Sequence, residues 1–288
     1  MTAPEIRESR SLGDYYAEMV SGRAGVRDPR VRTAFSTVPR EAFLGPGPWL
    51  IGHPAGGGYV RTPSDNLAFL YADVVVGLIP ERRLNNGEPS FHARCLQAVA
   101  IQPGETVVHV GAGAGYYSAI MAEITGATGR VEALEIDADL AAKAARNLEP
   151  WPQARVQSRS GLEAPIPEAD VIYVNAGVSG LADPWMDAIR PGGRLLVPLT
   201  SGWVGAVLLF TQVNARLFEA RTVSPTAIIP CVGGQDETMA MRLAAALGPP
   251  GSAGVTAVRS LRRGTAPDDS CWLAGDGWWL STAPVAVA

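Results

Sequence analysis

Between residues 91 and 200 the chain alternates short apolar runs with segments whose apolar residues recur at helical spacing. The apolar runs predict strands at 106–110, 130–135, 154–157, 170–175 and 193–198. The segments between them predict helices at 91–100, 115–125, 138–148 and 182–189. Strands that alternate with helices imply a doubly wound, mostly parallel sheet, so we expect a fold of the α/β class.

The pattern changes on both sides of this region. Residues 11–35 predict one helix packed on the main body, and residues 45–64, with six glycines and four prolines, predict a long loop. Beyond residue 200 we expect a β-rich extension, with strands at 203–211, 216–230, 254–261 and 271–281 and one helix at 236–247. These segments predict an N-terminal helical and loop cap (1–80), a core (81–211) and a C-terminal extension packed on the core (212–288).

One turn in the core has the composition of a ligand cradle. The apolar run 107–110 ends in Gly111, Gly113 and Gly115, and a helix is predicted directly afterwards. Glycines there let the main chain approach a ligand closely, and a helix N-terminus presents unpaired N–H groups. Glu135 closes the next strand, 20 residues after Gly115, where a carboxylate can accept hydrogen bonds from a ribose. The turn and the acid together predict a nucleoside-binding site.

The spacing of the glycines bears on which nucleoside binds. A dinucleotide site favours G-x-G-x-x-G, but the sixth position here is Tyr116, which disfavours a Rossmann oxidoreductase. Farther along, Ile189–Val197 combines a helix end, a Pro-Gly-Gly turn and a buried strand. In this order and spacing, the two motifs resemble those of S-adenosylmethionine-dependent methyltransferases.

The resemblance narrows to the protein-L-isoaspartate O-methyltransferase family on Val38–Phe43, Gly111–Tyr116, Asn147-Leu148 and Pro191–Gly193. It covers roughly residues 35–200 and implies a Rossmann-like class I methyltransferase fold with S-adenosyl-L-methionine as cofactor. By resemblance the cofactor contacts Gly111, Ala112, Gly113 and Gly115 with its methionine part, Glu135 with its ribose, and Ser160 and Gly161 near its adenine.

The chain departs from the family pattern at three places. His109 stands in the first strand where the family usually has an acid, and we expect it to be a structural histidine. Arg159-Ser160-Gly161 replaces Gly-Asp-Gly. The substrate loop, usually Thr-Ile-Ser-Gln-Pro, is replaced by a segment that we take as substrate-binding: Asn85, Asn86, Gly87, Glu88 and Pro89.

The loop departure bears on catalysis, because the family's serine is implicated in it. Gly87 occupies the serine position, and Ser90 lies three positions later. His92 begins the helix that follows. Ser90 and His92 are therefore the candidate catalytic residues. The Asn86-Gly87 pair favours a tight turn.

Bulk properties exclude several classes of partner. A net charge of −4 gives no basic surplus for nucleic acid. The apolar stretch 195–210 is interrupted by Pro198, Thr200, Ser201 and Gly202, so it predicts two strands and no membrane span. Cys95, Cys231 and Cys271 form neither a disulfide framework nor a metal-ligand spacing. The cysteine pattern predicts a protein without a bound metal. The same pattern and the lack of a signal-peptide pattern predict a cytoplasmic protein.

We therefore expect an S-adenosylmethionine-dependent O-methyltransferase that methylates a carboxylate of a peptide or protein. One alternative is a related methyltransferase with a different acceptor, a small molecule or a modified peptide. The other is a catalytically inactive homologue that binds cofactor or peptide. In-line transfer of a methyl group to a carboxylate needs alignment and exclusion of water more than acid–base chemistry, because the acceptor is already ionised at pH 7.

Overall fold

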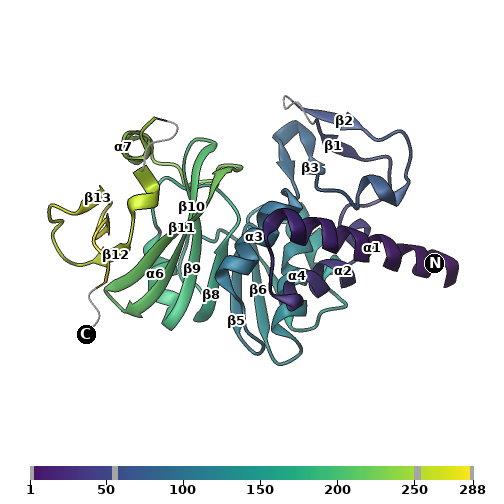
Figure 1. Ribbon diagram of the computed structural model, residues 1–288, viewed down its shortest axis with the longest axis horizontal. Helices are drawn as coiled ribbons and strands as arrows, with labels where there is room; N and C mark the ends of the chain where they lie inside the picture. Colours follow the sequence, from purple (N-terminus) through teal and green to yellow (C-terminus); the bar gives the residue numbers. More distant parts are fainter. Residues whose placement is uncertain (1–2, 54–57, 250–253, 286–288) are drawn as a thin grey trace. The chain divides into compact units, whose positions relative to one another are not determined.

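The computed structural model describes residues 3–53, 58–249 and 254–285. The chain divides into two compact units. The first unit contains the residues up to 105 together with 112–159, and the second contains 106–111 and the residues from 160 onward. Figure 1 labels the elements of both units, and each unit is described by itself below.

The first unit carries most of the helices. Its α-helices are α1 (Ala3–Ala24), α2 (Pro29–Thr37), α3 (Pro89–Val99), α4 (Tyr116–Thr125) and α5 (Ala138–Asn147), and its 3₁₀ helices are η1 (Arg40–Phe43), η2 (Leu67–Phe69) and η3 (Pro80–Arg82). The single helix predicted at 11–35 is wrong, because α1 ends at Ala24 and α2 begins at Pro29. Asp28 caps α2 by accepting the Arg30 N–H (2.9 Å), and Pro29 suits the first helical position.

The strands of the first unit form one parallel pair and two short hairpins. The parallel pair is β6 (Arg130–Glu135) and β7 (Ala154–Ser158), with α5 packed against both strands. The hairpins are β1 (Leu50–Gly52) with β2 (Tyr59–Arg61) and β3 (Gly77–Ile79) with β4 (Leu84–Asn85). The predicted loop 45–64 therefore contains a hairpin. Part of its glycine run, at 56–57, lies outside the described residues.

Aromatic side chains build much of the first unit's core. Tyr16, Phe35, Phe43 and Tyr116 are all at most 2 % exposed, and their rings meet at centroid distances of 5.5–6.4 Å. The Tyr16 and Tyr116 hydroxyls lie 3.3 Å apart. Tyr116 and its neighbour Tyr117 thus anchor α4 in the core, as expected of packing residues.

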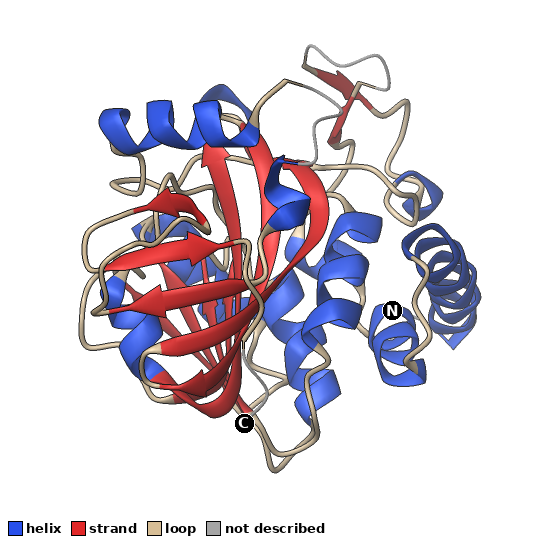
Figure 2. Cartoon of the chain, turned by 60° about the vertical axis from the view of Figure 1, so that its left-hand side comes forward, coloured by secondary structure: helices blue, strands red, loops and turns tan. Residues whose placement is uncertain are grey.

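Eight strands of the second unit lie side by side in one sheet, in the order β13-β14-β12-β11-β10-β9-β8-β5. The strands are β5 (Thr106–Val110), β8 (Ala169–Val174), β9 (Ile189–Ser201), β10 (Val204–Asn214), β11 (Leu217–Ala227), β12 (Ser260–Arg263), β13 (Cys271–Ala274) and β14 (Trp278–Ser281). β5, β8 and β9 are parallel, and every pair from β9 to β13 is antiparallel. The strong twist of the strands is visible in Figure 2.

Three helical segments complete the second unit: α6 (Asp183–Ala188), α7 (Glu237–Leu247) and η4 (Gly254–Ala257). α6 and α7 both contact β9. The predicted strand 254–261 is in fact η4 followed by β12, and the predicted strand 271–281 is the hairpin β13–β14, which turns at Gly277 (φ 71°). The α/β class and the β-rich extension predicted from the sequence are confirmed.

The Pro-Gly-Gly segment differs from its prediction. It was expected to be a turn before a strand, but β9 already begins at Ile189. Ala169 of β8 pairs with Ile189 of β9, but Val171, two residues later in β8, pairs with Arg194, five residues later in β9. The extra residues of β9, which include Pro191–Gly193, therefore form an irregularity within that strand. Gly192 has a φ of 76°, which accounts for a glycine at that point.

The apolar stretch 195–210 forms the antiparallel hairpin β9–β10, as predicted. None of the helices in the described part of the chain combines the length and the apolarity that a bilayer crossing requires.

Candidate functional site

The glycine turn has the backbone geometry that its sequence predicts. Gly111, Gly113 and Gly115 all have positive φ values, of 78°, 57° and 94°. Gly115 is the N-cap of α4 and offers no side chain to cap it. The first N–H groups of α4 therefore have no capping side chain, which is the arrangement found where a helix N-terminus binds a polar or anionic group.

Glu135 shapes this turn directly. It ends β6 and is 7 % exposed; its Oε2 accepts the Gly113 N–H (2.7 Å) and its Oε1 accepts the Asp137 N–H (2.9 Å). Burial raises the pKa of the Glu135 carboxyl, and the two backbone N–H groups act against that shift. Each carboxylate oxygen can accept a further hydrogen bond. Glu135 can thus fix the turn and still accept hydrogen bonds from ribose hydroxyls.

These first-unit residues fit the nucleoside cofactor that the sequence implies. The turn contributes left-handed glycines and an uncapped helix N-terminus, and the acid at the end of β6 retains acceptor capacity. Asn147 reinforces the turn, because its Nδ2 donates to the Ala114 carbonyl (2.9 Å).

Ser160 and Gly161 have structural roles within the second unit. A Cβ built on Gly161 would overlap the Val110 side chain in β5, so only glycine fits there. The Gly161 carbonyl accepts the Trp185 indole N–H (2.6 Å), and the Ser160 hydroxyl accepts the Leu162 N–H (3.2 Å). The contact of both residues with adenine stays a prediction.

The predicted substrate loop is a tight, hydrogen-bonded turn. Asn85 Oδ1 accepts the Gly87 N–H (2.9 Å), and Asn86 Oδ1 accepts the Val76 N–H (2.8 Å). Gly87 has a φ of 74°. Glu88 follows as the N-cap of α3, and its pKa is raised by burial and by the neighbouring Asp73 carboxylate. Pro89 then starts the helix.

A buried arginine holds the far side of this loop. The Arg40 side chain is fully buried, and its guanidinium donates to the carbonyls of Leu70, Ala72 (2.9 Å) and Val74 (2.6 Å). It also donates to Asn86 Oδ1 (3.4 Å). In the sequence, Arg40 was considered only as part of the Val38–Phe43 motif. A charged residue among the apolar residues Val38, Ala42 and Phe43 is the signal that could have indicated a buried arginine.

The two candidate catalytic residues lie in different surroundings. Ser90, at the start of α3, donates its N–H to Asp73 Oδ1 (2.8 Å), so Asp73 caps the helix, a role that the sequence analysis missed. His92 is 1 % exposed and stacks on Tyr117, with ring centroids 3.7 Å apart and planes at 22°. A Cβ built on Gly87 would overlap His92 Nε2, so the imidazole fills the space beside Gly87.

His109 lies inside β5, fully buried, with Tyr173 edge-on at 5.6 Å. Burial lowers its pKa to about 3. The imidazole is therefore neutral at pH 7 and its setting is that of a core residue, in keeping with its expected structural role.

Comparisons with known proteins now identify the family. The family model described as Protein-L-isoaspartate(D-aspartate) O-methyltransferase (PCMT) matches residues 68–236. The chain belongs to this family. A protein-L-isoaspartate O-methyltransferase of Methylorubrum populi is 30 % identical over 214 residues, which are 73 % of this chain and 90 % of that protein. One of Pyrobaculum neutrophilum is 29 % identical over 211 residues, covering 71 % and 91 %.

The fold also agrees with that of a solved PCMT. A protein-L-isoaspartate O-methyltransferase from Plasmodium falciparum, in complex with S-adenosyl-L-homocysteine, superposes with a TM-score of 0.61 and 17 % identity over 76 % of this chain and 98 % of that one. As a member of the PCMT family, the chain is an S-adenosylmethionine-dependent methyltransferase. Residues 237–288 lie beyond the match to the family model.

The cysteines and acidic residues show no metal chemistry in the described part of the chain. Cys95, Cys231 and Cys271 form no disulfide bond among the described residues. Among the described residues no group of three or more His, Cys, Asp or Glu side chains is arranged to hold a metal ion.

Proposed function

We propose that this PCMT family member methylates a carboxylate of a peptide or protein, as its relatives are named for doing. When bound, S-adenosylmethionine supplies an electrophilic methyl group on a positively charged sulfur, which an ionised carboxylate attacks without a general base. The chain must then hold cofactor and acceptor in line and exclude water.

The observation that carries the proposal is the contact between Glu135 and Gly113. It joins the acid at the end of β6 to the turn before α4. We propose that Ala112, Gly113 and Gly115 bind the methionine part of the cofactor and that Glu135 accepts hydrogen bonds from its ribose. Gly111, Ser160 and Gly161 complete the set that the family resemblance implies.

We propose that the acceptor lies against the loop formed by Asn85, Asn86, Gly87, Glu88 and Pro89. The loop's hydrogen bonds to Val76, just before β3, and to Arg40 support this role, because a fixed loop loses less conformational freedom when a peptide binds. His92 supports the turn from within, and we assign it as a positioning residue rather than a catalytic one. Ser90 remains the candidate whose side chain could contact the acceptor.

The decisive experiment is methylation with labelled S-adenosylmethionine. An isoaspartyl peptide and its aspartyl counterpart are incubated with the full chain, and base-labile methyl ester is measured. We expect ester on the isoaspartyl peptide, and loss of it in Glu135→Ala but not in Glu149→Ala, an exposed glutamate of the same unit. Binding of cofactor without ester on either peptide would contradict the assigned acceptor and favour a different one.

For location we propose the cytoplasm, which the three cysteines without a disulfide bond support. The net charge of −4 supports a protein partner rather than nucleic acid.

A further inference from the structure

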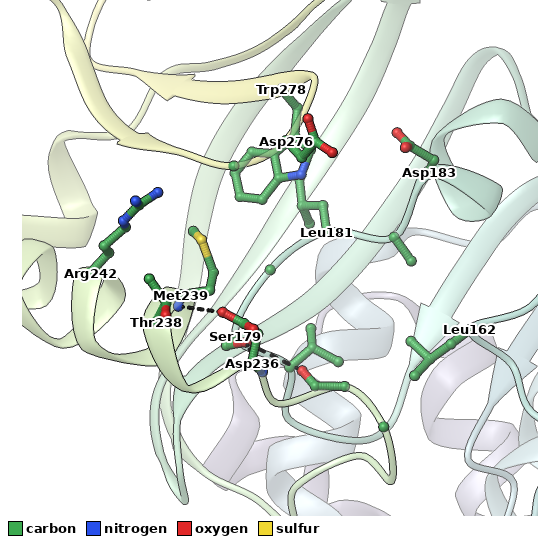
Figure 3. Close-up of a pocket in the computed structure, with 16 residues that line it drawn as sticks. Leu162, Ser179, Leu181, Asp183, Asp236, Thr238, Met239, Arg242, Asp276 and Trp278 are labelled. Carbon is green, nitrogen blue, oxygen red and sulfur yellow. Dashed lines mark hydrogen bonds between the residues drawn. The ribbon is translucent and has the colours of Figure 1, made fainter.

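The second unit contains a cavity of about 570 Å³. Its walls come from Leu162, from the loop Val178–Asp183 after β8, from the start of α7, and from the turn between β13 and β14 (Figure 3). α7 and that turn lie beyond the segment that matches the family model, which ends at residue 236. The cavity is thus formed jointly by the segment that matches the family model and by residues that follow it.

The cavity combines apolar walls with a surplus of negative charge. Leu162, Leu181, Met239 and Trp278 contribute apolar surface. The charged residues around it are three aspartates, Asp183, Asp236 and Asp276, and one arginine, Arg242. The lining therefore carries a net charge of −2, from three carboxylates and one guanidinium. An occupant with an apolar group and a positive charge complements it.

The three carboxylates are not equally available. Asp236 caps α7 by accepting the Met239 N–H (2.7 Å), and Asp183 pairs with Arg263 (3.0 Å). Asp276 is exposed at the tip of the β13–β14 turn, and its carboxylate pairs with no side chain in the described part of the chain. A cation in the cavity would therefore find its best partner in Asp276.

Unpaired donors indicate that the occupant has carbonyl groups. Trp278 is 5 % exposed and lines the cavity, yet its indole N–H has no acceptor among the described residues (Figure 3). The backbone N–H groups of Gly180 and Leu181, where Gly180 lies against the Trp278 ring, also lack acceptors within the described ranges. N–H groups without an acceptor in the chain can donate to a molecule in the cavity, and an extended peptide backbone supplies carbonyl acceptors for them.

The loop that forms this wall also contacts Gly111, the first glycine after β5. It starts at Asn175, whose Nδ2 donates to the Gly111 carbonyl (3.2 Å), and it ends in the cavity wall at Asp183. Backbone hydrogen bonds from Gly177 to Ile229 and from Val178 to Pro198 fix it between these points. A peptide seated in the cavity would lie against the same loop that supports Gly111.

We propose that this cavity binds an extended segment of the acceptor peptide, with an apolar side chain against Leu181 and Met239 and an adjacent basic side chain beside Asp276. The inference rests on the proposed function, since it describes the peptide that is methylated. It gives the C-terminal extension a role in choosing the acceptor.

The test uses fluorescein-labelled isoaspartyl peptides that differ at one position, with a Leu-Lys or a Leu-Glu pair placed three to eight residues on either side of the isoaspartyl residue. Binding is measured by fluorescence anisotropy and methylation by ester formation, with the full chain. We expect at least one Leu-Lys peptide to bind about tenfold more tightly than its Leu-Glu counterpart. Equal binding of the two series would overturn the proposal.

Variants of the chain test whether Asp276 causes the preference for the Leu-Lys peptide. Asp276→Lys should raise Kd and KM for the Leu-Lys peptide about tenfold with kcat within twofold, and should remove its advantage over Leu-Glu. Asp269→Lys makes the same charge change at an exposed position of the same extension outside the cavity, and should change neither value. Trp278→Phe keeps the ring but lacks the N–H, and should weaken binding of both peptides several-fold. Equal effects of Asp276→Lys and Asp269→Lys would refute the assignment.

The two proposals fail in different ways. Asp276-dependent binding without any methyl ester refutes carboxylate methylation and leaves the cavity assignment standing. Ester formation that is unaffected both by the Lys-to-Glu exchange in the peptide and by Asp276→Lys in the protein refutes the cavity assignment. The proposal of carboxylate methylation then still stands.

Discussion

Gly87 and His92 lie so close together that the residue at each position limits which residues fit at the other. A Cβ on Gly87 would overlap His92 Nε2, and the Gly87 backbone lies in the left-handed region at φ 74°. The His92 ring is in turn held by stacking on Tyr117. The loop that departs most from the family pattern is therefore supported by a compensating pair.

Placing a serine at this position should accordingly fail to improve the enzyme. Gly87→Ser is expected to lower the free energy of unfolding by about 1–3 kcal/mol, from backbone strain and overlap with the imidazole, and to raise KM for the acceptor. Adding His92→Ala should remove the overlap and recover part of the loss, with a coupling energy of about 1 kcal/mol. Urea unfolding and steady-state kinetics of the two single variants and the double variant measure this. Strictly additive effects would show that the two residues are independent.

Removing the Glu135 carboxylate should weaken the cofactor site. Glu135→Ala is expected to reduce S-adenosylmethionine affinity by about 1–3 kcal/mol, because it removes the proposed ribose acceptor and frees the Gly113 N–H. Calorimetry measures the affinity directly, with Glu149→Ala as the control. An unchanged affinity would mean that the ribose lies elsewhere.

The pH dependence of cofactor binding follows from the same residue. The pKa of Glu135 is raised above 4.5, mainly by burial, and protonation converts one acceptor oxygen into a donor. Affinity should therefore fall as the pH is lowered, beginning at a higher pH than an ordinary glutamate would allow. Calorimetry from pH 8 to pH 4 tests this, and Glu135→Gln should flatten the profile. A wild-type affinity that is constant down to pH 4 contradicts the expectation.

His109 should contribute to loss of stability in acid. Its pKa is about 3 in the folded chain against an ordinary value of 6.5, so the unfolded chain binds one more proton between these values. Stability from this group is complete above pH 6.5 and falls as the pH is lowered, by at most about 1.4 kcal/mol per pH unit. His109→Leu should flatten urea-unfolding stability between pH 6.5 and pH 4, whereas His53→Leu, at an exposed position, should leave the slope intact.

Arg40 should be essential for the packing beneath the predicted substrate loop, Asn85–Pro89. Arg40→Met leaves the buried carbonyls of Leu70, Ala72 and Val74 without their donor, and each such acceptor costs about 1–3 kcal/mol. We expect a loss of at least about 3 kcal/mol in the free energy of unfolding. Arg32→Met removes an exposed ion pair to Glu18 and should cost less than about 1 kcal/mol. Similar losses in the two variants would argue against a structural role for Arg40.

Much of the core was predictable because its patterns are local. The predicted strands 106–110 and 130–135 coincide with β5 and β6, since each is a short apolar run bounded by glycine or polar residues. The glycine turn was predictable for the same reason: its three glycines adopt the left-handed conformations that few other residues tolerate.

The remaining features depend on contacts distant in sequence. The sequence places Asp73 and Ser90 seventeen residues apart, and nothing local indicates that one caps the helix of the other. The overlap between Gly87 and His92 likewise requires knowing how α3 follows the loop. Pro191–Gly193 was mistaken for a turn because proline and glycine also occur at strand irregularities, which local propensity does not distinguish.

The sheet of the second unit has a consequence for how the chain can be shortened. Its strands run without interruption from β5 to β13, so the extension is joined to the core by main-chain hydrogen bonds. Cutting the chain after Asp236 would remove β12 and leave the Leu217–Glu219 part of β11 as an open edge. Open edges recruit strands from other molecules. The chain after Asp236 thus also covers this edge of the sheet, and a search for a minimal catalytic fragment should keep β12 in place.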